Sequence, residues 1–247
     1  MRKTSPLPPT PVAPPRRNGL LAQLAAEELA SLIPWLESVE LPLGLTLYEP
    51  DARITHVYFP TTGSVSVIIE TRDGAVEVAS VGREGLAGIA AVLYADSMPM
   101  RTFMQAKGHA YRIEADVLRK IVAARPGMQQ LFSRYTLALM NQIAQSVACN
   151  RLHSLEARCA RWLLMMHDRV DGDQLILTQE SLSYMLGVHR PAVTLAAGVL
   201  QKAGYIEYSR GKIIVTDRAG LESASCSCYE TVRRGFEALM GPEAAAA

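Results

Sequence analysis

The segment 190–201 is predicted to be a helix whose two faces carry different residue types. One face presents the side chains of Arg190, Pro191, Thr194, Leu195, Gly198 and Gln201. An arginine guanidinium matches O6 and N7 of guanine, a threonine hydroxyl can bond a base edge, and leucine or proline can pack on a thymine methyl group. The opposite face, which we expect to be buried, consists of Val193, Ala196, Ala197 and Leu200. This combination indicates a helix that reads base edges in a DNA major groove.

A shorter helix before this segment must hold its reading face in place. Thr178 is a good N-cap, and Glu180 in the first turn suits the positive end of the helix dipole. The shorter helix is expected to stop at Gly187, which can adopt the left-handed conformation of a sharp turn. Pro191 is tolerated in the first turn of the next helix, because its missing N–H would have no intrahelical partner. The pattern is typical of a helix-turn-helix with an apolar core formed by Leu182, Leu186, Val188, Val193 and Ala196.

A β-hairpin, or wing, is predicted directly after the second helix. Apolar residues in 205–208 and 212–215 flank the turn Ser209-Arg210-Gly211, which places basic side chains where they can contact phosphates. Residues 178–218 hold five basic and three acidic side chains, so motif geometry supports DNA binding more than charge does. A winged helix that contacts protein is the alternative. The predicted DNA contacts are Thr178, Gln179, His189, Arg190, Pro191, Thr194, Leu195, Gln201, Arg210 and Lys212.

Residues 39–113 show short apolar stretches between turn signals, which predicts a small β-barrel or jelly roll. Asp73-Gly74 lies between two such stretches and is a two-residue hairpin signal, since both turn positions tolerate positive φ. Leucines at helical spacing predict short helices within 18–38. Residues 1–17 contain six prolines and four basic residues, which predicts a disordered tail. The expected strands include Val57-Tyr58-Phe59, Val65-Ser66-Val67-Ile68-Ile69, Val76-Glu77-Val78 and Tyr111-Arg112-Ile113.

Residues 128–150 contain neither proline nor glycine and are predicted to form one helix of about 35 Å. Its apolar residues recur at a spacing of three or four and cover more than one side. A surface of this kind favours packing on a partner helix as well as on the chain's own barrel. A single helix buried within one protomer is the alternative. The predicted dimer interface is Met128, Phe132, Tyr135, Leu139, Ile143 and Val147.

Composition narrows the class of protein. The 247 residues carry 25 basic and 24 acidic side chains, and 49% are hydrophobic, which excludes global disorder. No apolar run reaches the ~20 residues of a membrane span, and the N-terminus has no apolar signal region, so we expect a cytoplasmic protein with no membrane partner. The sequence contains neither a phosphate-binding glycine loop with lysine nor a supportable Ser/His/Asp arrangement. We therefore expect that the protein is not an enzyme.

The chain resembles the transcription regulators of the cyclic-AMP-receptor/Fnr (Crp/Fnr) type. The strongest likeness is Leu177-Thr-Gln-Glu-Ser-Leu-Ser-Tyr-Met-Leu-Gly-Val-His-Arg-Pro-Ala-Val-Thr, and Gly63-Ser64-Val65 followed by Asp73-Gly74 is also family-like. The resemblance implies an α+β fold with a cyclic-nucleotide-binding-like β-barrel (jelly roll), a long dimerisation helix and a C-terminal winged helix-turn-helix. We accordingly expect a tail over 1–17, a sensor domain over 18–126, a dimerisation helix over 127–152 and a DNA-binding domain with a C-terminal helix over 153–240.

The same resemblance implies partners. A homodimer would bind near-palindromic double-stranded DNA with its recognition helices about 34 Å apart, and RNA polymerase is a further expected partner. The family's recognition helix opens with Ser-Arg-Glu and carries a later arginine. Here Arg190 keeps the first arginine, Pro191 replaces the glutamate and Leu195 replaces the later arginine, so the operator is expected to differ. A sensor module that acts through protein partners, without DNA, is the rival from another class.

The barrel departs from the family's cyclic-nucleotide binders. Those proteins use a Gly-Glu pair for the ribose hydroxyl and Arg-Ser/Thr-Ala for the phosphate. Gly88-Ile89 aligns with the first motif, and Arg101-Thr102, followed by Phe103, aligns with the second. Isoleucine cannot accept a ribose hydrogen bond, and a buried hydroxyl left unpaired costs about 1–3 kcal/mol. The predicted effector site is Gly88, Arg101 and Thr102, with an effector other than cyclic AMP, or none.

The four cysteines complete the set of reactive residues. The Fnr branch holds an iron–sulfur cluster on cysteines near the N-terminus, whereas no cysteine precedes Cys149 here, which excludes that cluster. Cys226-Ser-Cys228 is a tight pair that, with Cys149 and Cys159, could bind metal or sense oxidants. The histidines show no ligand spacing, so we predict no metal site and retain Cys226 and Cys228 as candidates. A cysteine-based redox- or metal-responsive regulator is an alternative, as are small buried hydrophobes.

Overall fold

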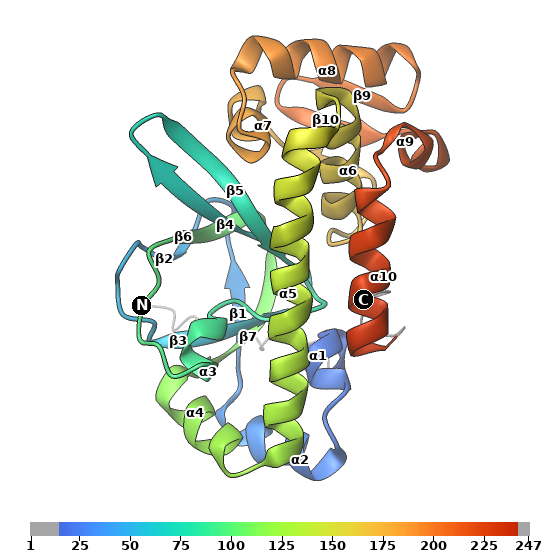
Figure 1. The fold of residues 1–247 in the computed structure, drawn as a ribbon. Coiled ribbons are helices and arrows are strands. Elements are labelled where there is room, and N and C mark those ends of the chain that lie inside the picture. The colour runs from blue at the N-terminus through green and yellow to red at the C-terminus, as the bar shows by residue number, and fades with distance from the viewer. Residues whose placement is uncertain (1–14, 242–247) are drawn as a thin grey trace, which may run out of the picture.

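The computed structural model describes residues 15–241, and one long helix, α5 (Pro126–Leu152), forms their central axis (Figure 1). Two antiparallel sheets lie against one side of α5, and a winged helix stands at its C-terminal end. The final helix, α10 (Cys228–Met240), runs back along α5 toward the sheets. None of the described helices combines the length and apolar composition needed to cross a lipid bilayer. Of the predicted tail, residues 1–14 lie outside the described residues, and Pro15–Arg17 form a 3-10 turn, η1.

The N-terminal sheets have the strand orders β1-β7-β3 and β2-β6-β4-β5. They are jelly-roll-like and do not close into a barrel, which confirms the predicted α+β class. The strands are β1 (Glu37–Leu41), β2 (Thr46–Tyr48), β3 (His56–Pro60), β4 (Ser64–Thr71), β5 (Gly74–Val81), β6 (Arg101–Ala106) and β7 (Gly108–Glu114). The surrounding helices are α1 (Gly19–Ala22), α2 (Ala26–Leu32), η2 (Ile33–Trp35), α3 (Ile89–Val92) and α4 (Ala115–Ala123).

The predicted β4–β5 hairpin is present, but its turn lies one residue earlier than expected. Thr71 pairs with Gly74, so Arg72 and Asp73 are the turn residues. Gly74 is the first residue of β5, where its φ of 142° is available to glycine and strained for other residues. The turn prediction was therefore wrong by one position, because strand pairing extends as far as Gly74.

Strand β4 is buried on both of its faces. Val65 belongs to the core of the N-terminal sheets, whereas Ile68 belongs to the core of the winged helix. The two residues are separated by an odd number of positions, so the alternation of side chains along the strand places them on opposite faces. Because one strand contributes to both cores, the winged helix is docked directly on the sheets.

The first half of α5 is buried within its own protomer. Met128, Phe132 and Tyr135 lie in the core of the N-terminal sheets, and the Tyr135 hydroxyl donates to the Leu86 carbonyl oxygen at 3.0 Å. A Cβ on Gly85 would overlap the Tyr135 ring, so glycine is required at this close approach. The predicted dimer contacts Met128, Phe132 and Tyr135 are thus wrong for this fold, and Leu139 also packs on the same core. Ile143 is half-buried, and only Val147 of the predicted set is well exposed.

The winged helix forms as the sequence predicts. Thr178 accepts a hydrogen bond from the Ser181 backbone N–H at 3.0 Å, and Gly187 adopts the left-handed conformation, with φ 62°, at the end of the first helix. The elements are α6 (Leu155–His167), β8 (Gln174–Ile176), α7 (Gln179–Leu186), α8 (Arg190–Lys202), β9 (Ile206–Ser209), β10 (Lys212–Val215) and α9 (Arg218–Ala224), with strand order β8-β10-β9.

A buried ion pair fastens the winged helix to the sheets. Arg169, just after α6, donates to Glu84 Oε1 at 2.6 Å and to Ser80 Oγ at 2.7 Å. Both charged side chains are about one-tenth exposed or less. A charge removed from water in this way is tolerated only while its partner is present.

We expect Glu84→Ala to lower the free energy of unfolding by about 3–5 kcal/mol, because it leaves the Arg169 charge buried and unpaired. Urea denaturation measures this loss. The control is Arg53→Ala, which breaks an exposed pair with Asp116 and should cost at most about 1 kcal/mol. Equal losses in the two variants would contradict a special role for the buried pair.

Candidate DNA-binding surface and its junction with the N-terminal sheets

Helix α8 presents one free face and buries the other. Val193, Ala196, Ala197 and Leu200 lie in the winged-helix core, as expected. Leu195 is 72% exposed, and Pro191 and Thr194 are exposed beside it. Val199, which the sequence-based set of contacts missed, extends this face by another turn, and its i+4 spacing from Leu195 could have indicated it. The face combines apolar side chains with Arg190 at the helix N-terminus.

Arg190 keeps its guanidinium free for an outside partner. Its Nε donates to the Gln179 side-chain oxygen at 3.3 Å, which steers the group across the gap between α7 and α8. Within residues 15–241 no carboxylate forms an ion pair with it. His189 is the exposed N-cap of α8, and its side chain makes no capping hydrogen bond. Gln179, His189 and Arg190 therefore gather at the end of α8 that faces α7.

The wing is joined to α8 by a side-chain bond. Gln201 Oε1 accepts from the Tyr208 backbone N–H at 2.9 Å, so this predicted base contact already has a structural partner. Arg210 and Gly211 form the two-residue turn between Ser209 and Lys212, and both have positive φ. Arg210 and Lys212 are exposed. The two cations project from a turn whose position is fixed relative to α8.

Glu77 on β5 connects the sheets to the winged helix. The Trp162 indole N–H of α6 donates to Glu77 Oε1 at 2.7 Å, and the Ser66 hydroxyl of β4 donates to the other carboxylate oxygen. Burial raises the pKa of Glu77, and this effect outweighs the two hydrogen bonds and the charges of Arg169 and Arg161. Ser66 also contacts Met185 of α7. Sheet and helix-turn-helix thus share a polar bond inside an apolar junction.

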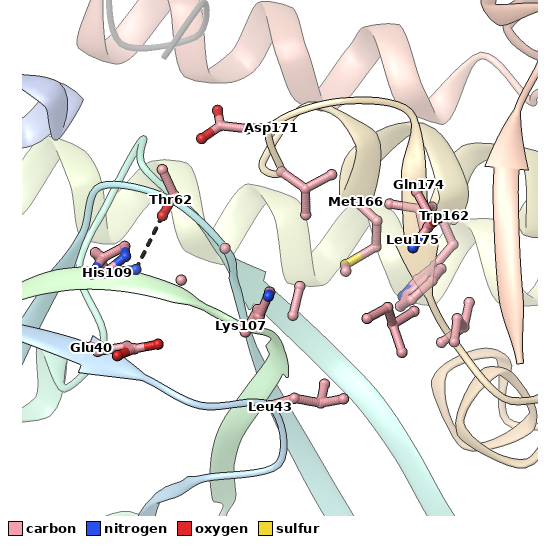
Figure 2. Close-up of a pocket in the computed structure, with 16 residues that line it drawn as sticks. Glu40, Leu43, Thr62, Lys107, His109, Trp162, Met166, Asp171, Gln174 and Leu175 are labelled. Atoms are coloured by element: carbon pink, nitrogen blue, oxygen red, sulfur yellow. Dashed lines mark hydrogen bonds between the residues drawn. The ribbon is translucent and has the colours of Figure 1, made fainter.

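A cavity of about 290 Å³ lies on the other side of this junction. In Figure 2 the side chains of Lys107, His109 and Glu40 come from the sheets, and those of Trp162 and Met166 come from α6. Gln174 and Leu175 of β8 close the winged-helix side. The cavity therefore has one wall from each half of the molecule.

The predicted effector residues already have partners in the protein. Arg101 pairs with Glu70 at 3.5 Å, and its guanidinium lies over the Phe103 ring. Thr102 is buried in the β4–β6–β2 sheet. Gly88 has φ 94° and precedes α3, and a Cβ there would meet the Tyr48 hydroxyl at 2.5 Å.

The cysteines divide into a group of three and a single residue. Cys149, Cys226 and Cys228 lie together beside His153, a residue that the sequence analysis did not connect with them. His153 follows Cys149 by four residues, one helical turn, which is the signal that was available in the sequence. Cys159 lies in the winged-helix core.

Comparison with known proteins assigns the winged helix. The model of the Crp-like helix-turn-helix domain matches residues 157–224, and a "CRP-like cAMP-activated global transcriptional regulator" of Mycobacterium tuberculosis is 21% identical over 209 residues, covering 81% of this chain and 93% of the relative. Residues 157–224 are therefore a Crp-like helix-turn-helix domain, and the chain as a whole is similar to regulators of the Crp/Fnr family. These matches support a DNA-binding transcription regulator of Crp/Fnr type, and the matched relative is a transcription regulator and not an enzyme.

Solved structures of other proteins share the fold. FixK2 from Bradyrhizobium japonicum has a TM-score of 0.65 at 16% identity, covering 77% of this chain and 98% of that one. The c-di-GMP responsive global regulator CLP of Xanthomonas campestris has a TM-score of 0.61 at 14% identity, covering 77% and 99%. Each match covers nearly all of the other chain, so this chain shares its overall fold with both proteins.

The position of Glu77 in this Crp/Fnr fold predicts a pH-dependent stability. Its raised pKa means that the folded state holds the proton more tightly than the unfolded chain does. The associated stability is complete below the unfolded pKa of about 4.3 and is lost as the pH rises through the folded pKa. In Glu77→Gln, the decline in unfolding free energy above about pH 4.3 should be shallower. Urea denaturation at a series of pH values measures it.

The matched control for Glu77→Gln is Glu207→Gln, an exposed carboxylate on β9. Its pH profile should follow that of the parent protein. A Glu77→Gln profile that also follows the parent would show that Glu77 does not titrate in this way.

Proposed function

We propose that the protein is a homodimeric regulator that reads a near-palindromic DNA site with α8 of each protomer. The observation that carries this proposal is the free face of α8, where Arg190, Thr194 and Leu195 are exposed above a fully buried opposite face. Leu195 and Val199 are exposed on the same face of α8, and adjoining exposed apolar side chains are a feature of interaction sites. A thymine methyl group is an apolar partner found in a major groove.

The division of contacts follows from the side chains. Arg190 reads guanine, Thr194 bonds a base edge, and Pro191 and Leu195 contact thymine methyl groups. Arg210 and Lys212 on the wing, with Thr178, Gln179 and His189 near the α7–α8 turn, contact phosphates and set the register. The operator should therefore carry few guanine contacts in each half-site. Gln201 holds the wing, so any contribution it makes to reading is secondary.

The dimer seam is the exposed stripe on the second half of α5. Met140 and Val147 are 60% and 67% exposed, and Leu137 before them and Ala144 between them are exposed as well. The spacing 137, 140, 144, 147 is the three–four alternation of a coiled-coil seam. This stripe replaces the predicted dimer interface, because Met128, Phe132 and Tyr135 of that interface are buried in the chain's own core. Two copies of α5 packed along this stripe would bury its apolar side chains.

Signal transfer follows from the shared strand. An effector that shifts β4 and β5 must also shift α6 and α7, because Ile68 and Glu77 lie inside the junction with the winged helix. Such a shift changes the population of two dimer arrangements with different spacing of the α8 helices. The effector is not cyclic AMP, since Ile89 offers no acceptor for a ribose hydroxyl and Arg101 is already paired.

Arg190→Ala should weaken specific DNA binding by about 1–3 kcal/mol and relax selectivity at one base position in each half-site. In vitro selection from random duplexes, followed by titration of the selected site, measures both effects. The control is Arg234→Ala, an exposed arginine on α10 that pairs with Glu230, for which selectivity should be unchanged. A selected consensus identical to that of the parent would remove Arg190 from base reading.

Met140→Glu should convert the dimer to a monomer, because two carboxylates would face each other across the seam. Sedimentation equilibrium measures the association state. Leu93→Glu adds the same charge at a similarly exposed apolar residue of the N-terminal region and should leave the dimer intact. A dimeric Met140→Glu protein would place the interface elsewhere.

A further inference from the structure

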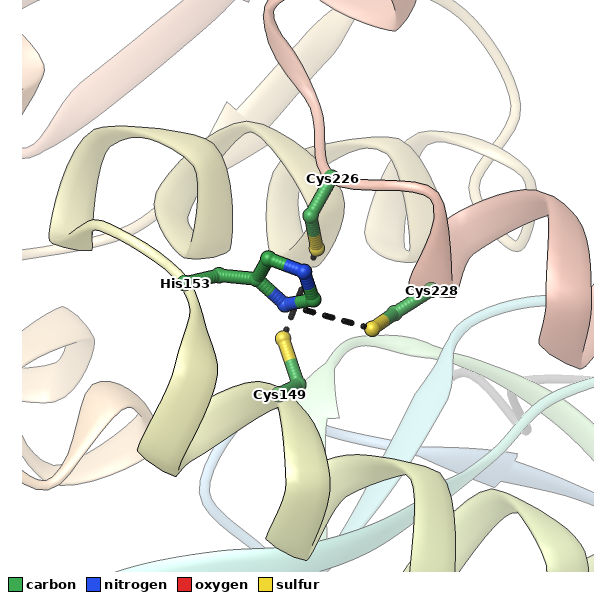
Figure 3. A group of neighbouring side chains, drawn as sticks. All are labelled: Cys149, His153, Cys226 and Cys228. Atoms are coloured by element: carbon green, nitrogen blue, oxygen red, sulfur yellow. Dashed lines mark hydrogen bonds between the residues drawn. The ribbon is translucent and has the colours of Figure 1, made fainter.

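Four metal-ligating side chains meet where α5 ends and α10 begins. Cys149 and His153 lie one turn apart at the C-terminal end of α5, and Cys226 and Cys228 lie at the start of α10 (Figure 3). Their ligand atoms all lie within 4.8 Å of one another. Figure 3 shows the three sulfur atoms and the imidazole turned toward one centre. Two segments 77 residues apart in sequence therefore supply two ligands each.

The separations fit a single tetrahedral ion. Zinc bonds of about 2.3 Å to sulfur and 2.0–2.1 Å to nitrogen place neighbouring ligand atoms about 3.5–3.8 Å apart. The Cys149 and Cys226 sulfur atoms are 3.4 Å apart, and Cys228 Sγ lies 3.4 Å from His153 Nδ1. A small expansion of the group would admit one ion. The thiolates of a multi-iron cluster would have to lie much further apart.

A buried cation lies close to this group. All three cysteines are buried, and the Cys149 and Cys226 sulfur atoms lie within hydrogen-bonding distance of each other. Arg161 is buried, and its positive charge acts on the Cys149 and Cys226 thiols. Its Nε has no hydrogen-bond acceptor, and no carboxylate in the described part of the chain forms an ion pair with it. Three thiolates and one imidazole around a divalent cation carry a net charge of −1, which Arg161 would balance.

We propose that Cys149, His153, Cys226 and Cys228 bind one Zn²⁺ ion in a closed tetrahedral site. Three thiolates with one imidazole are a donor set of structural zinc sites. These four protein ligands fill all four tetrahedral positions, so none is left for water. Gln145 donates from Nε2 to Cys228 Sγ at 3.0 Å and serves as an outer partner that orients this ligand.

The ion would cross-link α5 to α10 at the point where α5 meets the winged helix. His153 is the C-cap of α5, and Ser154 caps α6 directly after it. Helix α10 packs along α5 as far as Tyr135, whose ring centroid lies 6.4 Å from that of Phe236. A bound ion would hold the first residue of α10 against the last turn of α5. It would therefore fix the position of α10 along α5 and the angle between α5 and α6. This gives a role to the C-terminal helix, which the DNA-reading function leaves unexplained.

The test is the zinc content of the full-length protein, purified without a metal-binding tag under reducing conditions and measured by inductively coupled plasma mass spectrometry. We expect about one zinc ion per chain, lost in Cys228→Ser and in His153→Ala. The control is Cys159→Ser, since Cys159 is equally buried but lies apart from the group, and it should keep the zinc. Gln145→Ala should keep the ion but weaken its binding about 10–100-fold in chelator competition.

A second measurement does not depend on how the variants fold. Metal-free wild-type protein titrated with Co²⁺ should take up one equivalent and show the visible absorption of tetrahedral cobalt with thiolate charge-transfer bands. Hydrogen exchange over residues 228–240 should slow as the metal is added. An as-isolated protein with no zinc and no cobalt uptake, one with a Cys149–Cys226 disulfide, or one with iron in place of zinc would each overturn the proposal. None of these readouts depends on DNA binding.

Discussion

The arrangement of this molecule depends on β4 being buried on both faces. Most strands of an antiparallel sheet keep one face for water, and this one gives its second face to another domain's core. Val65 and Ile68 lie three residues apart, hence on opposite faces, and belong to different hydrophobic clusters. Because the junction is apolar, the polar groups inside it must be satisfied internally, and Glu77, Trp162 and Ser66 satisfy one another. The docking of the winged helix is thus tied to the geometry of one hairpin.

The two halves of α5 have different surroundings, because the sheets cover only its first half. Its first half fills the core beneath the sheets, so large side chains such as Phe132 and Tyr135 are unavailable to a partner. Its second half extends past the sheets, and there no part of residues 15–241 covers Met140 and Val147. Helix α10 occupies a further side of α5. What remains exposed is a narrow stripe, the geometry of a two-helix seam.

The ionic groups near the junction differ in what holds them. Arg169 forms a direct ion pair with Glu84, and the two opposite charges compensate each other, so both side chains can stay buried. Arg161 is as deeply buried but forms no ion pair within the described residues, and its charge acts on Glu77 and on the thiols of Cys149 and Cys226. A metal ion binds thiolates and not thiols, so a metal-loaded site would place negative charge beside Arg161. With the ion bound, the angle between α5 and α6 would depend on the metal as well as on the effector.

The sequence by itself determined the local elements and the reading helix. Thr178 and Gly187 act through their own backbone neighbours, and the buried face Val193-Ala196-Leu200 follows from helical periodicity, so the helix-turn-helix could be predicted with its residues in place. The order of sheet, long helix and winged helix was predictable for the same reason, together with the family resemblance.

Only the tertiary structure decided which apolar surfaces pack against the rest of the chain and which stay exposed. Periodicity marks Tyr135 and Met140 as apolar alike, and only the packing of the sheets shows that one is core and the other is free. The hairpin turn moved to Arg72-Asp73 because strand pairing overrode the local Asp-Gly signal. Cys149 and His153 become neighbours of Cys226 and Cys228 only because α10 returns along α5, and no spacing within the chain encodes a contact closed by packing between helices so distant in sequence.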